Sequence, residues 1–224
     1  MSDHARRSDV VDQLQAFALS DENREMAGTM ISLFPEGRQA SAVLPILDLA
    51  QRQNDGWLPR AALDYVAELL AIPRIQVYEV ATFYSMFNLA PVGRHHVQVC
   101  TNISCWLRGS DDVLAACRNV LGIGLGETSD DGLFTLSEAE CLGACVNAPM
   151  MQIGDDYYED LDARNTRAVL TALTAGETPE PGPQNGRKGC EPAGGLTSLT
   201  EAPAKAPKTH RKRARAAPVV KGGA

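Results

Sequence analysis

Two pairs of closely spaced cysteines constrain this chain more than any other feature of its sequence. Cys100 and Cys105 form a C-x4-C pair, and Cys141 and Cys145 form a C-x3-C pair after 35 intervening residues. Two short turns that each carry two thiols can direct four thiolates to one place, and four thiolates suit either zinc or an iron–sulfur cluster. The sequence therefore predicts a metal centre with these four side chains as its ligands.

The spacing of the pairs favours a [2Fe–2S] cluster. Structural zinc sites prefer C-x2-C knuckles, although wider spacings occur, so a zinc-stabilised module without a redox role stays an alternative. A thiol–disulfide redox centre is disfavoured because the chain has no C-x-x-C motif. A histidine ligand from His95 or His96, as in Rieske centres, is disfavoured because four cysteines already fill the site. Small residues such as Gly143 would let the backbone approach the cluster sulfides.

The two remaining cysteines need no metal. Cys117 lies on the apolar face of a predicted helix, where a thiol behaves as a small buried hydrophobe. Cys190 lies in a polar C-terminal segment and is predicted to be a free thiol.

Residues 16–90 predict a small helical bundle after a flexible start at residues 1–15. Ser20 is a candidate N-cap, and Pro59 and Pro73 precede two further amphipathic segments. A helix over residues 37–53 contains Pro45, which is tolerated if it falls in the first turn, with Ser41 as the N-cap, and should kink the helix otherwise. Four such helices imply a bundle, and nothing in it predicts catalysis.

Residues 91–175 predict a second domain of strands and helices. A strand over residues 96–99 leads into Cys100, and another over residues 133–136 leads towards Cys141. Helices capped by Ser110 and Asp162 and a hairpin through residues 150–158 complete a β–α–β then β–β–α order. This is the order of a thioredoxin-like fold, with each cysteine pair on a loop after a strand.

Residues 176–224 predict a disordered tail. They contain seven Pro and eight Gly and almost no large apolar side chain, so little burial can offset the entropy of ordering them. They also carry nine Lys/Arg against four Asp/Glu, including the basic run from His210 to Arg215, which is predicted to be a solvated segment.

Charge and motifs exclude several functions. The whole chain has a net charge of −7 and residues 1–175 a net charge of −12, which predicts no nucleic-acid binding. No apolar run is long enough to span a bilayer, and the N-terminus does not read as an export signal, so a cytosolic location is expected. The chain lacks a G-x-G-x-x-G fingerprint, a P-loop and a nucleophile elbow, so NADH and flavin have no predicted site here. A one-electron centre without these sites requires a partner protein.

Four motifs carry a family resemblance over about residues 15–175. They are GWLPRAALDYVAELL, VYEVATFYSMFNLAPVG, VCTNISCWLRGS and EAECLGACVNAPMMQI. The chain resembles the 24 kDa-type [2Fe–2S] subunit of the NADH-oxidising module of respiratory complex I, an NADH:quinone oxidoreductase. The resemblance implies a helical N-terminal segment, then a thioredoxin-like ferredoxin domain in which Cys100, Cys105, Cys141 and Cys145 each ligate the cluster.

The resemblance also implies a supporting role within a larger complex, because such a chain is not catalytic alone. It implies docking against a flavoprotein subunit that binds FMN and NADH, beside a neighbouring iron–sulfur subunit of the peripheral arm. FMN would pass single electrons to the cluster of this chain. The expected location is the cytoplasmic side of a bacterial inner membrane, without a membrane span of its own. Similar subunits serve NAD-linked formate dehydrogenases and hydrogenases, which stay alternative hosts.

Overall fold

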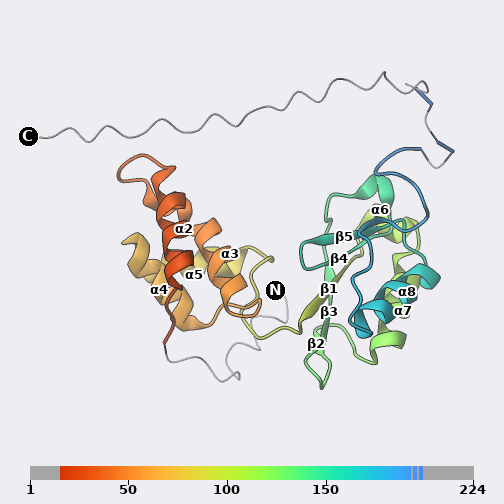
Figure 1. Ribbon diagram of the computed structural model, residues 1–224, viewed down its shortest axis with the longest axis horizontal. Coiled ribbons are helices and arrows are strands. Elements are labelled where there is room, and N and C mark those ends of the chain that lie inside the picture. The colour runs from red at the N-terminus through yellow and green to blue at the C-terminus, as the bar shows by residue number, and fades with distance from the viewer. Residues whose placement is uncertain (1–15, 193, 196, 199–224) are drawn as a thin grey trace, which may run out of the picture.

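The chain folds into a helical unit followed by a sheet domain (Figure 1). The computed structural model describes residues 16–192, 194–195 and 197–198. The flexible start predicted at residues 1–15 and the basic run from His210 to Arg215 lie outside the described residues. Within the described residues, no helix has the length and apolar character needed to cross a membrane.

The helical unit confirms the predicted bundle, and Pro45 lies in the first turn of a helix, where proline is tolerated. Its elements are α2 (Asp21–Ser32), a 3-10 turn η1 (Gln39–Ala42), α3 (Val43–Gln53), α4 (Arg60–Leu70) and α5 (Arg74–Phe83). The Ser20 hydroxyl accepts a hydrogen bond from the Asn23 N–H, as expected of an N-cap. Pro45 is the third residue of α3, where its missing N–H has no intrahelical acceptor to lose. The N-cap of α3 is Ala42, not Ser41.

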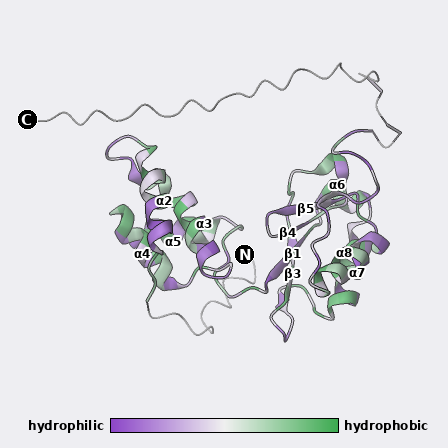
Figure 2. Ribbon diagram, viewed as in Figure 1, coloured by the Kyte–Doolittle hydropathy of each residue, from purple (hydrophilic) through white to green (hydrophobic). Residues whose placement is uncertain are grey.

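One apolar core holds the bundle together. Side chains from α3, α4 and α5 meet in it, and its members include Ile46, Leu47, Val66, Leu70 and Val77, all fully buried. Figure 2 shows hydrophobic residues recurring along these helices, as helical periodicity requires. The bundle is therefore a folding unit with its own core.

The sheet domain has the strand order β2-β3-β1-β4-β5-β6. Its strands are β1 (His95–Cys100), β2 (Glu127–Thr128), β3 (Phe134–Ala139), β4 (Met151–Ile153), β5 (Asp156–Glu159) and β6 (Gly182–Pro183). The central strand β1 runs parallel to β3 and antiparallel to β4, and β4 forms a hairpin with β5. The predicted β–α–β then β–β–α order is confirmed, and the domain has the thioredoxin-like fold.

Helices α7 (Ser110–Leu121) and α8 (Ala163–Thr174) lie side by side on one face of this sheet (Figure 1). They bury the alternate residues of the strands, among them Val97, Leu136 and Met151. The opposite face is polar, and on it His96 Nε2 lies 2.7 Å from Ser137 Oγ. The alternation along β1 and β3 thus decides which face the helices cover.

The linker between the two units is fixed at Gly93. Its N–H donates a 2.6 Å hydrogen bond to Thr135 Oγ1 of β3. A Cβ at this position would lie 2.6 Å from the carbonyl carbon of Phe134. Only glycine allows the linker to approach the strand this closely.

Two local expectations are corrected by the structure. The N-cap of α7 is Gly109, with a left-handed φ of +95°, and Ser110 is the first helical residue. A short helix α6 (Ile103–Leu107) ends just before it, so the chain must reverse sharply there, and glycine does this without strain. Cys100 ends β1, Cys105 lies on α6 and Cys145 begins a 3-10 turn, so only Cys141 lies on irregular chain after a strand.

The segment after α8 also differs from the expected disorder. Residues 177–192, which we call the strap, return along β5 and add strand β6 to the sheet. The strap is held by polar contacts, including an Arg187–Asp160 ion pair of 2.7 Å, rather than by an apolar core. The sequence predicts disorder here because the segment lacks apolar side chains, and composition does not reveal polar contacts between distant residues. The prediction for residues 199–224 lies outside the described residues.

Candidate metal centre

The parallel pairing of β1 and β3 brings the two cysteine segments together. Cys100 is the last residue of β1 and lies opposite Ala139 at the end of β3, two residues before Cys141. The carboxyl ends of parallel strands meet at the same edge of a sheet. Both cysteine pairs therefore lie at this edge.

The first pair is buried against the sheet. Cys100 and Cys105 are each only 2% exposed, and they belong to one small buried cluster. Helix α6 places Cys105, and Asn102 caps it by accepting a 2.8 Å hydrogen bond from the Ile103 N–H. Ala148 and Met150 form the apolar surroundings of this pair.

The second pair is exposed. The sulfur atoms of Cys141 and Cys145 lie 3.4 Å apart. Gly143, with a φ of +90°, lets the chain turn tightly between them, and Cys145 begins the 3-10 turn η2 (Cys145–Asn147). The four thiols thus divide into a buried pair and an exposed pair.

The two pairs lie close enough to influence one another electrostatically. Burial, with contributions from Cys100 and Cys145, raises the pKa of Cys105 to about 12. The hydrogen bond with Cys141 raises the pKa of Cys145. Without metal the Cys105 and Cys145 thiols hold their protons, and a metal must displace those protons to bind.

Hydrogen bonds also fix the two segments to each other and to the sheet. Thr101 Oγ1 donates to the Glu138 carboxylate, and Asn102 Nδ2 donates to Glu140 Oε2 at 2.7 Å. Tyr157 Oη, from β5, donates to the Leu142 carbonyl at 2.8 Å. The backbone between Cys141 and Cys145 is therefore anchored from β5. The cysteine pattern alone does not reveal Tyr157.

The donor set suits a [2Fe–2S] cluster. Such a cluster is held by four cysteine thiolates, and here the thiols stand as two pairs at one edge with an apolar wall behind the inner pair. In the described part of the chain, no group of three or more His, Cys, Asp or Glu side chains is placed to hold one metal ion.

The two histidines and Cys117 lie away from the site. His95 and His96 begin β1, roughly 16 Å along the strand from its cysteine end. Cys117 is fully buried in the core between α7 and the sheet, and burial raises its pKa to about 12. Cys190 is exposed on the strap.

An exposed apolar rim lies next to the cysteines along the chain. Ile103, Trp106 and Leu107 of α6 are 69%, 59% and 72% exposed, and Val146, beside Cys145, is 66% exposed. Figure 1 shows α6 at the upper end of the sheet domain, away from the bundle. Large apolar side chains gathered at a surface mark a contact with another molecule.

Comparison with protein families matches residues 27–174 to the thioredoxin-like [2Fe-2S] ferredoxin model. An NADH-quinone oxidoreductase subunit of Rickettsia conorii is 59% identical over 157 residues, which cover 70% of this chain and 94% of that protein. The mitochondrial NADH dehydrogenase [ubiquinone] flavoprotein 2 of Dictyostelium discoideum is 46% identical over 187 residues, covering 84% of this chain and 76% of that protein.

One solved structure shares the fold. It is a NAD+-reducing [NiFe]-hydrogenase, with a TM-score of 0.50 and 21% sequence identity. The match covers 58% of this chain and 23% of the hydrogenase chain. At this identity the similarity concerns the fold alone.

Proposed function

Because the chain belongs to the thioredoxin-like [2Fe-2S] ferredoxin family, we propose that it is the electron-transfer subunit of an NADH:quinone oxidoreductase, respiratory complex I. Its [2Fe–2S] cluster exchanges single electrons with FMN on a partner flavoprotein. The observation that carries this is the 59% identity over 94% of the Rickettsia protein, together with two cysteine pairs at one sheet edge. The chain is part of an oxidoreductase and is not catalytic alone.

We assign Cys100, Cys105, Cys141 and Cys145 as the four cluster ligands. A bound [2Fe–2S] cluster supplies one-electron chemistry. The residues of this chain supply its surroundings: Ala148 and Met150 exclude water behind the inner pair. Tyr157 fixes the backbone between the outer pair. The buried and exposed pairs give the site a closed side towards the sheet and an open side towards solvent.

We assign the exposed rim of Ile103, Trp106, Leu107 and Val146 as the docking surface for the flavoprotein subunit. The outer cysteines are exposed beside it, so a partner bound there would approach the cluster closely and cover the rim. Aromatic anchors such as Trp106 dominate the binding energy of many interfaces.

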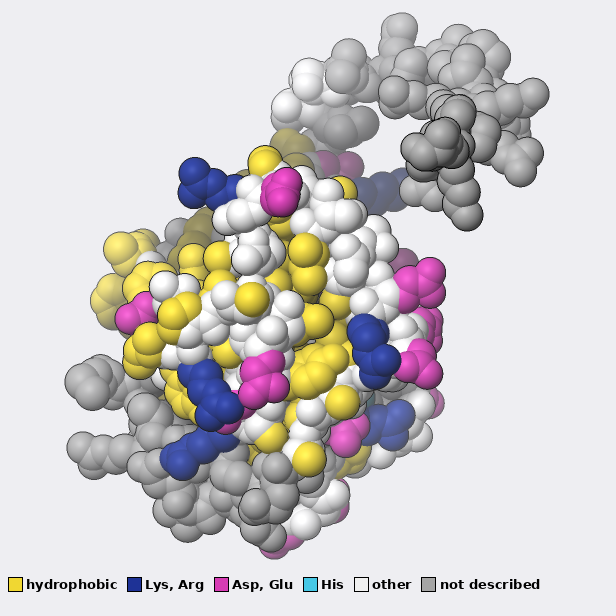
Figure 3. All heavy atoms as spheres, turned by 90° about the vertical axis from the view of Figure 1, so that its left-hand side faces the viewer, with side chains coloured by type: hydrophobic (Ala, Val, Ile, Leu, Met, Phe, Trp, Pro, Cys, Tyr) yellow, Lys and Arg dark blue, Asp and Glu magenta, His cyan; other side chains and the backbone are white. Residues whose placement is uncertain are grey.

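The bundle offers a second contact area for the peripheral arm, including its neighbouring iron–sulfur subunit. Ile75, Phe83 and Met86 are 64%, 79% and 51% exposed. Figure 3 shows hydrophobic side chains mixed with charged ones on the outer face of the bundle. An assembled complex would bury such side chains, and the acidic residues 1–175 do not suit nucleic acid.

The complex is membrane-associated, and we place this chain on the cytoplasmic side of a bacterial inner membrane. The bacterial assignment is supported by the higher identity to the Rickettsia protein, 59%, than to the mitochondrial protein, 46%.

The test is anaerobic purification of the full chain, with iron, sulfide and zinc analysis and EPR after dithionite reduction. About two irons per chain and a rhombic S = 1/2 signal are the expected result. A colourless protein that contains zinc and gives no signal after iron reconstitution would contradict the proposal.

The host complex is tested separately by co-purification. The FMN-containing subunit of complex I should accompany the chain, and Trp106→Ser should weaken that association without removing the cluster. Association with a formate dehydrogenase or a hydrogenase instead would reassign the host and leave the cluster assignment intact.

A further inference from the structure

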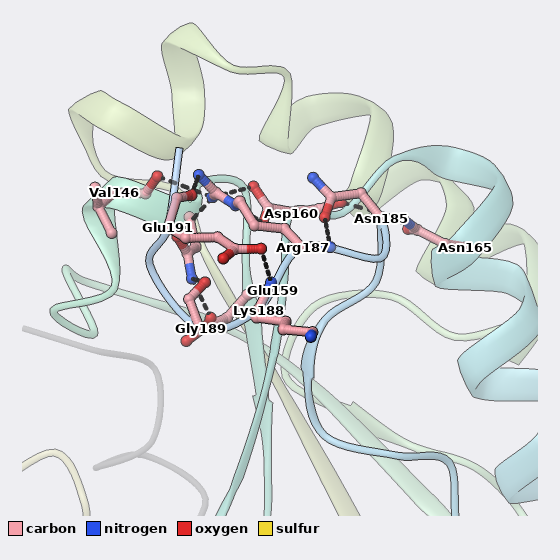
Figure 4. A network of polar contacts seen from close by, with 10 residues as sticks. Val146, Glu159, Asp160, Asn165, Asn185, Arg187, Lys188, Gly189 and Glu191 are labelled. Atoms are coloured by element: carbon pink, nitrogen blue, oxygen red, sulfur yellow. Dashed lines mark hydrogen bonds and ion pairs between the residues drawn. The ribbon is translucent and has the colours of Figure 1, made fainter. Parts of the chain in front are cut away.

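Arg187 of the strap joins three separate parts of the sheet domain (Figure 4). Its Nε and Nη2 atoms donate to the two carboxylate oxygens of Asp160 at 2.9 and 2.7 Å, and its Nη1 donates to the Glu191 carbonyl at 3.0 Å. The same Nη2 atom also donates to the Val146 carbonyl at 3.2 Å and to Asn147 Oδ1 at 2.5 Å. One guanidinium therefore connects the residue after β5, the strap and the η2 turn.

The η2 turn begins with Cys145, one of the two exposed thiols. Asn147, two residues further on, is only 3% exposed and is bonded on several sides. Its side-chain amide donates to the Gly189 carbonyl of the strap at 3.0 Å, and its own carbonyl accepts from the Asp160 N–H at 2.7 Å. The position of Cys145 is thus tied to the strap through Val146 and Asn147.

Burial makes these contacts strong and specific. The side chains of Arg187 and Asp160 are 11% and 8% exposed, so removing either one leaves the other charge in a poorly solvated place. The contacts also need the planar fork of an arginine. A lysine can neutralise Asp160, but its single ammonium cannot reach Asp160, Glu191 and the η2 turn together.

We propose that Arg187 is a positioning residue of the metal centre, through which the strap holds Cys145 and the η2 turn in place for the cluster. The strap lies beyond residue 174, where the family match ends. The role of Arg187 in cluster binding rests on the proposed function, whereas its contacts with η2 are present in the metal-free chain. The two can therefore fail separately.

The test compares Arg187→Met and Arg187→Lys with the wild-type full chain. The matched control is Arg52→Met, which removes another arginine bonded to an aspartate of the same β4–β5 hairpin, Asp155. In metal-free protein, hydrogen exchange is measured at the Asn147 and Asp160 amides, which are bonded to the carbonyls of Ala144 and Asn147. The amides of α7 report whether the domain as a whole stays folded.

Both Arg187 variants should exchange the Asn147 and Asp160 amides about tenfold faster or more, because both lose the contacts to η2, and Arg187→Met also loses the buried ion pair. The α7 amides and the Arg52→Met protein should keep wild-type exchange. In cluster-loaded protein, the half-life of the visible absorbance under an iron chelator should shorten several-fold in both variants, and the EPR line shape should change.

Wild-type exchange in both variants would overturn the proposal. Full rescue by Arg187→Lys would also overturn it, because charge neutralisation of Asp160 would then suffice. If exchange of the α7 amides rose as much as exchange of the Asn147 and Asp160 amides, Arg187 would stabilise the domain as a whole. The proposal would then fail. If wild-type protein bound no cluster, the proposed function would fail, and the exchange data would still decide whether the strap holds η2.

Discussion

Arg52 of α3 binds Asp155, in the turn between β4 and β5, through two hydrogen bonds of 2.8 and 2.9 Å. The pair joins the bundle to the sheet domain across 103 residues of sequence. Arg52 also contacts Asp48 of its own helix at 2.9 Å. Both side chains of the pair are more than half exposed, so its contribution is to orientation more than to stability.

Asp155→Asn should loosen the two units with little loss of stability. The hydrogen bond with Arg52 lowers the pKa of Asp155 in the folded chain. Its contribution is therefore complete above the unfolded pKa of about 3.9 and is lost as the pH falls through the lower folded value. We expect less than about 1 kcal/mol of lost unfolding free energy at pH 7. We also expect a larger radius of gyration at that pH, measured by small-angle X-ray scattering.

The difference in scattering between Asp155→Asn and wild type should disappear at low pH, once Asp155 is protonated. Glu68→Gln is the control, since it removes an exposed ion pair with Arg74 within the bundle. Its scattering should match wild type throughout. Identical scattering of Asp155→Asn and wild type at pH 7 would refute a role for the pair in orienting the units.

Two glycines should respond to alanine in opposite directions. Gly93→Ala would place a Cβ 2.6 Å from the Phe134 backbone, so it should lower the unfolding free energy by about 1–3 kcal/mol or more. Gly28 lies inside α2 with no atom within 4 Å of an added Cβ, so Gly28→Ala should stabilise the chain by about 0.4–1 kcal/mol. Denaturant unfolding measures both, and a neutral Gly93→Ala would show that the linker can leave β3.

Local patterns predicted most of the fold. Apolar periodicity identified the bundle helices and the central strands, because burial of one face determines both. The cysteine spacing identified the four thiols, and parallel pairing of β1 with β3 explains why they meet. These features depend on neighbours a few residues apart or on one simple pairing rule.

The features that the sequence did not predict depend on polar contacts between distant residues. Arg187 contacts Val146 across 41 positions and Asp160 across 27, and no short motif records either contact. Gly109 is the N-cap of α7 because α6 ends just before it, and α6 is too short for an apolar period to reveal it in the sequence. Ser110 has a buried hydroxyl without a hydrogen-bond partner among the described residues, which a capping preference would not predict.

Cys117 should make the chain less stable in alkaline solution. Burial raises its pKa to about 12 in the folded state, above the value of about 8.5 in an unfolded chain. Its contribution is complete below about pH 8.5 and is lost as the pH rises towards the folded pKa, by at most about 1.4 kcal/mol per pH unit. Cys117→Ala should therefore lose less stability than wild type between pH 7 and 9.5.

The measurement for Cys117 is the unfolding free energy of metal-free, reduced protein at the two pH values. Burial also raises the pKa values of Tyr158 and Cys105, but both groups are common to the two proteins and cancel in the comparison. Cys190→Ala, at an exposed thiol, should match the wild-type pH dependence. A parallel loss in Cys117→Ala and wild type would contradict the expected ionisation of Cys117.

The buried and exposed cysteine pairs should respond differently to serine. Cys100→Ser and Cys141→Ser should each weaken or abolish the cluster, because a serine hydroxyl is a poor replacement for a thiolate ligand. Only Cys100→Ser should also destabilise the metal-free chain, by about 1–3 kcal/mol, since it places a hydroxyl in the apolar surroundings of Ala148 and Met150. Cys141 is exposed, so its replacement should change that stability by less than about 0.5 kcal/mol.

Iron and sulfide content with EPR measures cluster binding by these variants, and denaturant unfolding of the metal-free chain measures their stability. Cys117→Ser, at a thiol in the core between α7 and the sheet, should leave the cluster spectrum unchanged. An unchanged spectrum in either ligand variant would remove that cysteine from the site. A large stability loss in Cys141→Ser would instead show that the outer pair is packed without metal, because an exposed side chain has little burial to lose.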